Sequence, residues 1–332
     1  MQDSLVHLTY AGGDYDRTAA LISGRIEPEG IRLNYLSLPS HETFWRMLQF
    51  QEFDASELSC ANYFVLCSRG ESPFVALPVF PSRTFRHSAI YINTESGIRE
   101  PADLKGRKVG CAEYAMTAAV WVRAFLQDDF GVLPSDLRWV LGGLEQPGRR
   151  ERIAFHPPPG VHIEQAPQDR SLVEMLEDGQ VDALITPSIP SVFLVGSPRV
   201  ARLFPDFQRV EADYYQRTGI FPIMHTVVLR RDVYDRYPWA AASLYKAFCS
   251  ARDLALARLY DSDALRVSLS WTVAYLEQER GLRGQDPWPY GFSANRATLE
   301  ALKRHLADQG LLERDFPLEQ VFAPSTLESV RH

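Results

Sequence analysis

The sequence predicts an α/β protein of two lobes with a ligand cleft between them, and three observations lead to this prediction. Short apolar strands alternate with amphipathic helices from the start of the chain, which indicates βα units around mainly parallel sheets. At 332 residues the chain is long enough for two domains that each bury a core. A second βα series interrupts the first, so the chain has to pass from one lobe to the other and back.

The order of the βα series sets the expected lobe boundaries. Strands are predicted near Val6–Tyr10 and Asp54–Leu58, and the second of these runs straight into a helix over Ala61–Ser68. Residues 142–167 are rich in Pro, Gly and charge and are expected to form a long surface loop. Helices are expected to dominate after residue 232. We predict a discontinuous lobe I of residues 1–90 and 225–332, and an inserted lobe II of residues 91–224.

Composition and charge restrict the classes of function. A hydrophobic content of 45% is that of a globular protein, and a formal charge of −7 without a basic stripe makes nucleic acid an unexpected partner. Neither a signal peptide near Met1–Thr9 nor a run of ~20 apolar residues is present, so we predict a cytoplasmic protein with no membrane partner. The four scattered cysteines are expected to be free thiols. Residues 234–248 offer apolar surface that can pair subunits in a homo-oligomer.

In open α/β sheets, ligands bind beyond the carboxyl ends of the strands, where helix starts present free N–H groups. Four polar side chains stand in such loops: Arg17, Ser59, Tyr114 and Thr117. Each can orient the oxygens of a ligand, and each fits equally well as a helix cap or a turn residue, Thr117 as the cap of its helix. Trp288, Pro289, Tyr290 and Asn295 form either a wall of the cleft or ordinary packing.

The densest polar cluster, Arg83 to His87, precedes the first predicted crossing between the lobes. Its two guanidinium groups, on Arg83 and Arg86, suit a carboxylate ligand, because a guanidinium and a carboxylate pair through two parallel hydrogen bonds. The alternative is a solvated basic turn. His225 stands at the second crossing, where it is either a packed core residue or a partner of His87 across the hinge.

Glu57 ends a strand that is otherwise apolar or small. A buried carboxylate has to be paired, hydrogen-bonded or shifted in pKa, so Glu57 is a proton donor, a partner for His or Arg, or a metal ligand with His87 and His225. The sequence lacks the HExxH, GxSxG, Walker and GxGxxG patterns. The sequence therefore lacks the motifs that usually indicate a hydrolase, a kinase or a dehydrogenase.

Several strings resemble the 4,5-dihydroxyphthalate decarboxylase family. They are GDYDRT at 13–18, FDASELS at 53–59, PSRTFRH at 81–87, LKGRKVG at 104–110 with EY at 113–114, WVRAFL at 121–126, GIFPIMH at 219–225 and PSTLES at 324–329. The likeness spans nearly the whole chain. The LKG element is shared by many solute-binding proteins, whereas its combination with the FRH and FPIMH strings is much more specific.

This resemblance implies a type II periplasmic-binding-protein-like fold that acts inside the cell as a carboxy-lyase of aromatic compound catabolism and phthalate degradation. The implied reaction is the non-oxidative conversion of 4,5-dihydroxyphthalate to protocatechuate, by ring protonation and then loss of CO2. Each carboxyl of this substrate is para to a hydroxyl that supplies electrons, so no organic cofactor is needed. Ser188 stands where family members can carry a basic residue, and a related hydroxylated aromatic acid fits as well.

Roles can be given to the candidate residues on this basis. His87 or His225 protonates the ring, because imidazole titrates near the working pH, and Glu57 sets its tautomer or deprotonates the phenol. The remaining candidates bind substrate: Arg83, Arg86 and Arg17 hold carboxylates, while Ser59, Tyr114 and Thr117 orient oxygens. We expect no metal, and the alternative is a divalent metal that bridges Glu57 and the histidines. A cytoplasmic binding protein for aromatic carboxylates, without catalysis, is the alternative function.

Overall fold

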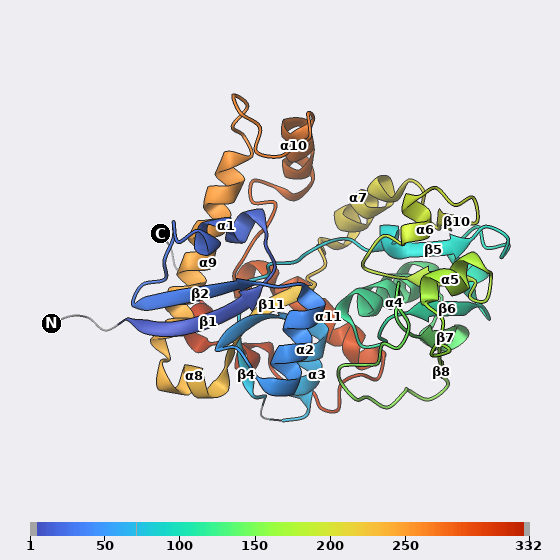
Figure 1. The fold of residues 1–332 in the computed structure, drawn as a ribbon, viewed down its shortest axis with the longest axis horizontal. Helices are drawn as coiled ribbons and strands as arrows, with labels where there is room; N and C mark the ends of the chain where they lie inside the picture. The colour runs from blue at the N-terminus through green and yellow to red at the C-terminus, as the bar shows by residue number, and fades with distance from the viewer. Residues whose placement is uncertain (1–4, 71, 329–332) are drawn as a thin grey trace. The chain divides into compact units, whose positions relative to one another are not determined.

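The computed structural model describes residues 5–70 and 72–328 (Figure 1). Two predictions touch residues outside this range, because the expected lack of an export signal includes Met1–Ser4 and the PSTLES string ends at Ser329. None of the described helices is long and apolar enough to cross a membrane.

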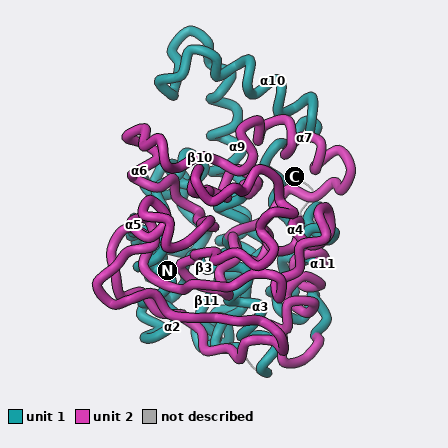
Figure 2. Tube along the Cα trace, turned by 90° about the vertical axis from the view of Figure 1, so that its right-hand side faces the viewer, with its two compact units in different colours: residues 1–83, 225–299, 316–332 teal, residues 84–224, 300–315 magenta. Residues whose placement is uncertain are grey.

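The chain forms two compact units (Figure 2). Residues 1–83, 225–299 and 316–332 make the first unit, and residues 84–224 and 300–315 make the second. This division differs from the predicted lobes, because residues 84–90 and 300–315 belong to the second unit. The chain therefore passes between the units four times, where we expected two passages.

The first unit is built on a five-stranded sheet in the order β2-β1-β3-β11-β4. Its strands are β1 (Val6–Gly12), β2 (Ile31–Ser37), β3 (Ala55–Ser59), β4 (Phe74–Leu77) and β11 (His225–Arg230). β1 pairs in parallel with β2 and β3, whereas β11 is antiparallel to both of its neighbours. The start of β11 consequently lies at the edge of the sheet where β1 and β3 end.

The second unit is built on a sheet of its own, which includes the strand β5 that follows the passage from the first unit. Its six-stranded sheet runs β10-β5-β9-β6-β7-β8, with β5 antiparallel to β9 and β10. The strands are β5 (Ile90–Asn93), β6 (Lys108–Cys111), β7 (Arg138–Leu141), β8 (His162–Gln165), β9 (Ala183–Ile185) and β10 (Val200–Arg202). In each sheet the antiparallel strand is the one that follows a passage between units.

Helices cover both sheets (Figure 1). In the first unit they are α1 (Ala19–Ile22), α2 (Ser40–Phe50), α3 (Cys60–Ser68), α8 (Arg231–Arg236), α9 (Trp239–Arg258) and α10 (Thr272–Arg283). In the second unit they are α4 (Thr117–Phe130), α5 (Leu172–Glu177), α6 (Ser191–Leu194) and α7 (Phe207–Thr218). α11 (Phe292–Asp308) begins in the first unit and ends in the second. Short 3-10 turns are η1 (Asp16–Thr18), η2 (His87–Ala89), η3 (Pro101–Leu104), η4 (Pro134–Asp136), η5 (Leu318–Val321) and η6 (Pro324–Thr326).

Local sequence explains where several elements begin and end. β3 runs directly into α3, as predicted, because the Ser59 side chain accepts a hydrogen bond from the backbone N–H of Asn62 and caps the helix. The segment 142–167 was expected to be all loop, but it contains β8, which extends the sheet beside β7. The short strand β10 and helix α7 also escaped prediction. β10 is only three residues long and is decided by its pairing with β5, and α7 is a polar helix that buries only Tyr214.

Candidate active site

Glu57 lies in the middle of the first sheet and has no exposed surface. Its strand, β3, is flanked by β1 and β11, and Val227 is its register partner on β11. A carboxylate at such a position has lost its hydration, so it needs hydrogen-bond donors or a cation to remain ionised.

Three donors reach the two carboxylate oxygens of Glu57. His225 Nδ1 lies 2.5 Å from Oε1, and the hydroxyl of Tyr15 donates to the same atom at 2.8 Å. The backbone N–H of Gly13 donates to Oε2 at 2.9 Å. Because an ionised carboxylate only accepts, Nδ1 of His225 carries a hydrogen. The other ring nitrogen, Nε2, is then the atom that can exchange a proton with a ligand.

His225 is the first residue of β11 and stands opposite Ser59 in the sheet. Because β11 starts where β1 and β3 end, the imidazole sits at the carboxyl edge of the parallel strands, which is where α/β sheets bind ligands. The ring of Phe44 meets the imidazole edge-on, with ring centroids 4.8 Å apart, and limits its rotation. The side chain is 18% exposed, so a small molecule can reach it.

The electrostatics of the pair keep Glu57 charged. Burial alone raises the pKa of a carboxyl, but the His225 ring and the hydrogen bonds from Gly13 and Tyr15 outweigh it and hold the pKa of Glu57 below its usual value. Burial, and after it the same carboxylate, raises the pKa of the Tyr15 hydroxyl. Glu57 is therefore an anion at neutral pH.

Arg17 stands next to this group with its guanidinium between two aromatic rings. Its Cζ lies 4.1 Å from the ring centroid of Tyr15 and 4.4 Å from that of Trp288. Nε donates to the carbonyl oxygen of Pro81 at 2.6 Å, and Nη1 donates to Asp16 at 3.0 Å. Within the described residues Nη2 makes no hydrogen bond. This edge of the guanidinium can therefore pair with a carboxylate.

Tyrosines complete the surroundings of Glu57. Tyr35 donates to the carbonyl oxygen of Gly13 at 2.6 Å, and its ring packs against Tyr10 with centroids 4.9 Å apart. Gly13 allows this arrangement, because a Cβ at that position would overlap the ring of Tyr15. The buried hydroxyls of Tyr10 and Tyr290 have no hydrogen-bond partner among the described residues.

The structure thus brings together three predicted residues, Glu57, His225 and Arg17, and adds residues that sequence reasoning missed. Tyr15 is the main omission, although it lies in the GDYDRT string. Trp288 contacts Arg17 and donates to the carbonyl oxygen of Phe80 at 3.0 Å, so it is part of the wall around the guanidinium.

Ser59 and Arg83 have structural contacts in the first unit. Ser59 caps α3. Arg83 is 5% exposed and donates from Nη1 to Asn295 Oδ1 at 2.7 Å and to the carbonyl oxygen of Pro289 at 3.1 Å. Its guanidinium thus connects the start of α11 to the segment that precedes the helix. The predicted role of Arg83 in binding substrate stays a prediction.

His87 and Arg86 belong to the second unit, whereas Arg83, with which they were expected to form one cluster, belongs to the first. The His87 ring stacks on Phe125, with centroids 4.0 Å apart, and neither nitrogen has a hydrogen-bond partner among the described residues. Burial lowers the pKa of His87 to about 4, so the ring is neutral at working pH. Burial also lowers the pKa of Arg86 to about 10, and its Nη1 donates to the carbonyl oxygen of Pro187 at 3.3 Å.

Tyr114 and Thr117 lie at the start of α4. Thr117 is the first helical residue and Met116 is the N-cap, so the expectation that Thr117 caps the helix is wrong. Tyr114 is fully buried; its ring stacks on Phe155 with centroids 5.2 Å apart, and its carbonyl oxygen accepts a hydrogen bond from Arg123.

The alternative of a divalent metal that bridges Glu57 and the two histidines stays a prediction, because His87 belongs to the other unit. Among residues 5–70 and 72–328, no group of three His, Cys, Asp or Glu side chains gathers closely enough to hold a metal ion.

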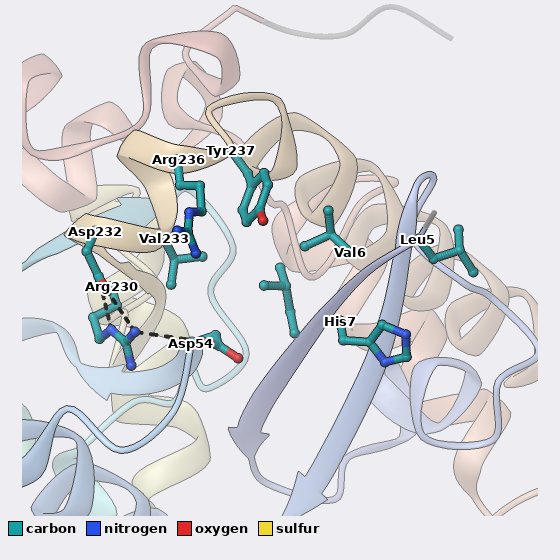
Figure 3. A pocket seen from close by; sticks show the side chains of 10 residues that line it. Leu5, Val6, His7, Asp54, Arg230, Asp232, Val233, Arg236 and Tyr237 are labelled. Atoms are coloured by element: carbon teal, nitrogen blue, oxygen red, sulfur yellow. Dashed lines mark hydrogen bonds and ion pairs between the residues drawn. The ribbon is translucent and has the colours of Figure 1, made fainter. Parts of the chain in front are cut away.

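A cavity of about 620 Å³ opens at the other end of the first sheet (Figure 3). It is lined by Leu5, Val6, His7, Leu8, Asp54, Arg230, Asp232, Val233, Arg236 and Tyr237. These residues include the start of β1, whereas Gly13 follows its end, about 20 Å away at the usual rise of a strand. Arg230, one of its lining residues, is paired with Asp232 at 2.6 Å.

Comparison with known proteins decides the family. The chain is 40% identical over 328 residues to a 4,5-dihydroxyphthalate decarboxylase from Comamonas testosteroni, an alignment that covers 99% of each chain. The chain belongs to the 4,5-dihydroxyphthalate decarboxylase family. A second member, from Pseudomonas putida, is 42% identical over 211 residues, which is 64% of this chain and 82% of that protein. No protein-family model matches the sequence.

Solved structures similar to this decarboxylase-family chain agree on the fold. The periplasmic aliphatic sulphonate binding protein SsuA from Escherichia coli aligns over 98% of this chain and 99% of its own, with a TM-score of 0.55 and 13% identity. The desulfurization enzyme DSZB aligns over 96% of both chains, with a TM-score of 0.50 and 18% identity. At these identities the likeness concerns the fold alone, and it confirms the predicted periplasmic-binding-protein-like fold.

Proposed function

We propose that this protein is a carboxy-lyase that converts 4,5-dihydroxyphthalate to protocatechuate and CO2. The observation that carries the proposal is the 40% identity, over 99% of both chains, to a protein of that name. The chemistry around Glu57 supports it, because the reaction needs a proton donor and a cation for carboxylates.

The substrate contains its own source of electrons. Each of its carboxyl groups is para to a hydroxyl, so protonation of the carbon that bears a carboxylate gives a dienone once the para hydroxyl loses its proton. The bond to the carboxylate then breaks, CO2 leaves, and the electron pair returns to the ring, which regains its aromaticity and takes back the phenolic proton. One proton is consumed for each CO2 released. The protein therefore has to deliver a proton to carbon and to orient the ring.

His225 is the proton donor in this proposal. Its Nδ1 faces Glu57 at 2.5 Å, which leaves Nε2 for the substrate. The carboxylate of Glu57 fixes the tautomer and the orientation of the imidazole ring, as a carboxylate does beside a catalytic histidine. Arg17 holds a carboxylate through its free Nη2 edge. His87 is disfavoured as the donor, because its buried, neutral ring is stacked on Phe125.

One assay tests the reaction. Purified protein is incubated with 4,5-dihydroxyphthalate in D2O, and product is analysed by NMR and mass spectrometry. We expect protocatechuate with one deuterium at the carbon that lost CO2. Phthalate, which lacks both hydroxyls, is the control and should not react. Binding of 4,5-dihydroxyphthalate without product would instead identify a binding protein, the alternative favoured by the fold shared with SsuA.

The remaining parts of the proposal concern the cellular compartment and the need for a cofactor. We place the enzyme in the cytoplasm, because its four cysteines are unpaired thiols, as is usual in reducing compartments. We also propose that turnover needs neither an organic cofactor nor a divalent metal. Unchanged turnover after treatment with a chelator, with metal analysis of the same sample, supports this, and a loss that added metal restores would refute it.

A further inference from the structure

The second unit contains a segment of four residues that docks charged side chains onto the turn before α4. We call residues 149–152 the strap; it belongs to the connection between β7 and β8. The turn follows β6 and contains Glu113, Tyr114 and Ala115. It lies at the carboxyl edge of the second sheet, so its backbone N–H groups are placed as those of a ligand-binding loop are.

Three strap residues make these contacts. Arg149 donates to Glu113 Oε1 from Nε at 2.8 Å and from Nη2 at 2.5 Å, and Arg152 donates to the same oxygen at 2.9 Å. The carboxylate of Glu151 accepts hydrogen bonds from the backbone N–H groups of Tyr114 and Ala115. Glu151 therefore occupies the position in which a bound carboxylate would meet the turn.

Unsatisfied donors beside Glu151 indicate that this position suits an exogenous anion. Arg123 is 1% exposed, and its Nη1 has no hydrogen-bond partner among the described residues; the same holds for the hydroxyl of the fully buried Tyr114. The other guanidinium atoms bind Gln309 and the Tyr114 carbonyl, and Cζ lies 3.8 Å from the Tyr114 ring centroid. Buried polar atoms usually find partners, so two orphaned donors beside one carboxylate call for an explanation.

Glu151 itself is an imperfect occupant. Its second oxygen, Oε2, has no partner among the described residues, and Oε2 of Glu113 is also without one. Burial and the neighbouring Glu113 raise the pKa of Glu151 to about 7, which means that the protein binds its charged form poorly. A side chain held at such a cost can be displaced by a ligand that satisfies more donors.

We propose that the N–H groups of Tyr114 and Ala115 form a carboxylate site, which Glu151 fills as an internal substitute until an aromatic carboxylate displaces it. Arg123 Nη1 and the Tyr114 hydroxyl supply further donors to the incoming group. The ligand class rests on the proposed function, whose substrate is an aromatic dicarboxylate. The Glu151 carboxylate and the ligand therefore compete for the same backbone N–H groups.

Calorimetric titration with phthalate tests the competition, because phthalate carries both carboxylates and lacks the hydroxyls required for reaction. If Glu151 fills the site nine-tenths of the time, Glu151→Ala should bind phthalate about tenfold more tightly than wild type. Glu151→Gln keeps the side-chain volume and should shift affinity in the same direction. Glu145→Ala is the matched control: it removes an exposed carboxylate of the same connection, which bonds Ser191 instead.

Equal or weaker binding by both Glu151 variants, with Glu145→Ala like wild type, would overturn the proposal. A tighter complex in all three variants would also overturn it, because a general charge effect would then explain the gain. The outcome does not depend on turnover. Phthalate affinity can respond as expected in a protein that makes no protocatechuate, and a protein that makes protocatechuate can show no change in phthalate affinity.

Proton release gives a second measurement. A displaced Glu151 moves to solvent, where it ionises, so wild type should release a proton on binding phthalate at about pH 6.5, and Glu151→Gln should release less. The titratable or charged groups that interact with Glu151 are Glu113, Tyr114, Cys111, Arg123 and Arg152. All of them remain in the variant, so the difference between the two proteins isolates Glu151. Equal release by both would contradict its displacement.

Discussion

Replacing Glu57 by glutamine tests whether Glu57 and His225 act as one proton-donating unit. The amide keeps the shape of the buried side chain but removes its negative charge. It can also donate a hydrogen bond to His225 Nδ1, which moves the ring hydrogen to Nε2 and leaves a neutral imidazole. A general acid contributes typically ~10²- to 10⁴-fold to the rate. At about 1.36 kcal/mol for each factor of ten, the expected loss is about 2.7 to 5.4 kcal/mol of transition-state stabilisation.

The structure predicts how two substitutions combine. Glu57→Gln and His225→Gln should each lower kcat by ~10²- to 10⁴-fold, and the double variant should be no slower than the worse single variant, because residues that act as a unit are not additive. Initial rates of protocatechuate formation from pH 5 to 9 give kcat and kcat/KM. His41→Gln, on the exposed side of α2, is the control and should match wild type.

Two results would refute the reasoning. Losses that multiply in the double variant would mean that Glu57 and His225 act independently, despite the 2.5 Å contact. Near-full turnover of Glu57→Gln would mean that the carboxylate does not assist the imidazole. Thermal melts of each variant ensure that rates are compared for folded protein.

Four further outcomes follow from the geometry. Tyr15→Phe removes one of the hydrogen bonds to Glu57 and should lower kcat about tenfold, with a shifted pH–rate profile; an unchanged profile would contradict the assigned contact. Arg17→Lys should raise KM by about 10- to 100-fold with a smaller change in kcat, measured by steady-state kinetics, because the planar fork that pairs with a carboxylate is lost. His87→Leu should keep kcat within about twofold and retain the melting temperature, since neither ring nitrogen has a hydrogen-bond partner among the described residues; a loss of ~10²-fold would return His87 to the role of donor. The lowered pKa of Glu57 stabilises the fold above its unfolded-state pKa of about 4.3, and this contribution is lost as pH falls through the lower folded-state pKa. Denaturant unfolding from pH 7 to 3 should therefore show a shallower acid loss in Glu57→Gln than in wild type.

Much of the fold could be predicted because its signals are local. The apolar patterns of β1, β3 and α3 depend on residues a few positions apart, and the structure reproduces these elements. For Ser59 the sequence left a helix cap and a ligand contact open, and the structure shows the cap. The predicted cap of α4 was wrong because its position depends on more than the side chain. Thr117 has a side chain that can cap a helix, but the turn before it places Met116 at the N-cap. The sequence did not predict β8, because a short polar edge strand forms only by pairing with its neighbour, here β7.

The residues of the candidate site also fall into those that the sequence indicated and those that only the structure placed. A carboxylate in an apolar strand marked Glu57 from sequence, and the family strings contain His225, Arg17 and Tyr15. Arg83 and Arg86 are three residues apart and read as one basic cluster, yet the chain leaves the first unit between Arg83 and residue 84. Their side chains consequently bind different partners. The expected cleft between the lobes stays a prediction.

The sequence by itself determined the alternation of strands and helices, the burial of Glu57 and, through strings spread along the chain, the family. Only the tertiary structure decided which histidine faces that carboxylate. Glu57 and His225 are 168 positions apart, and they meet because β11 returns antiparallel to β3 and begins at the edge where the parallel strands end. Patterns along a chain report which face of an element is buried, whereas the partner of a buried charge is set by strand pairing between distant segments.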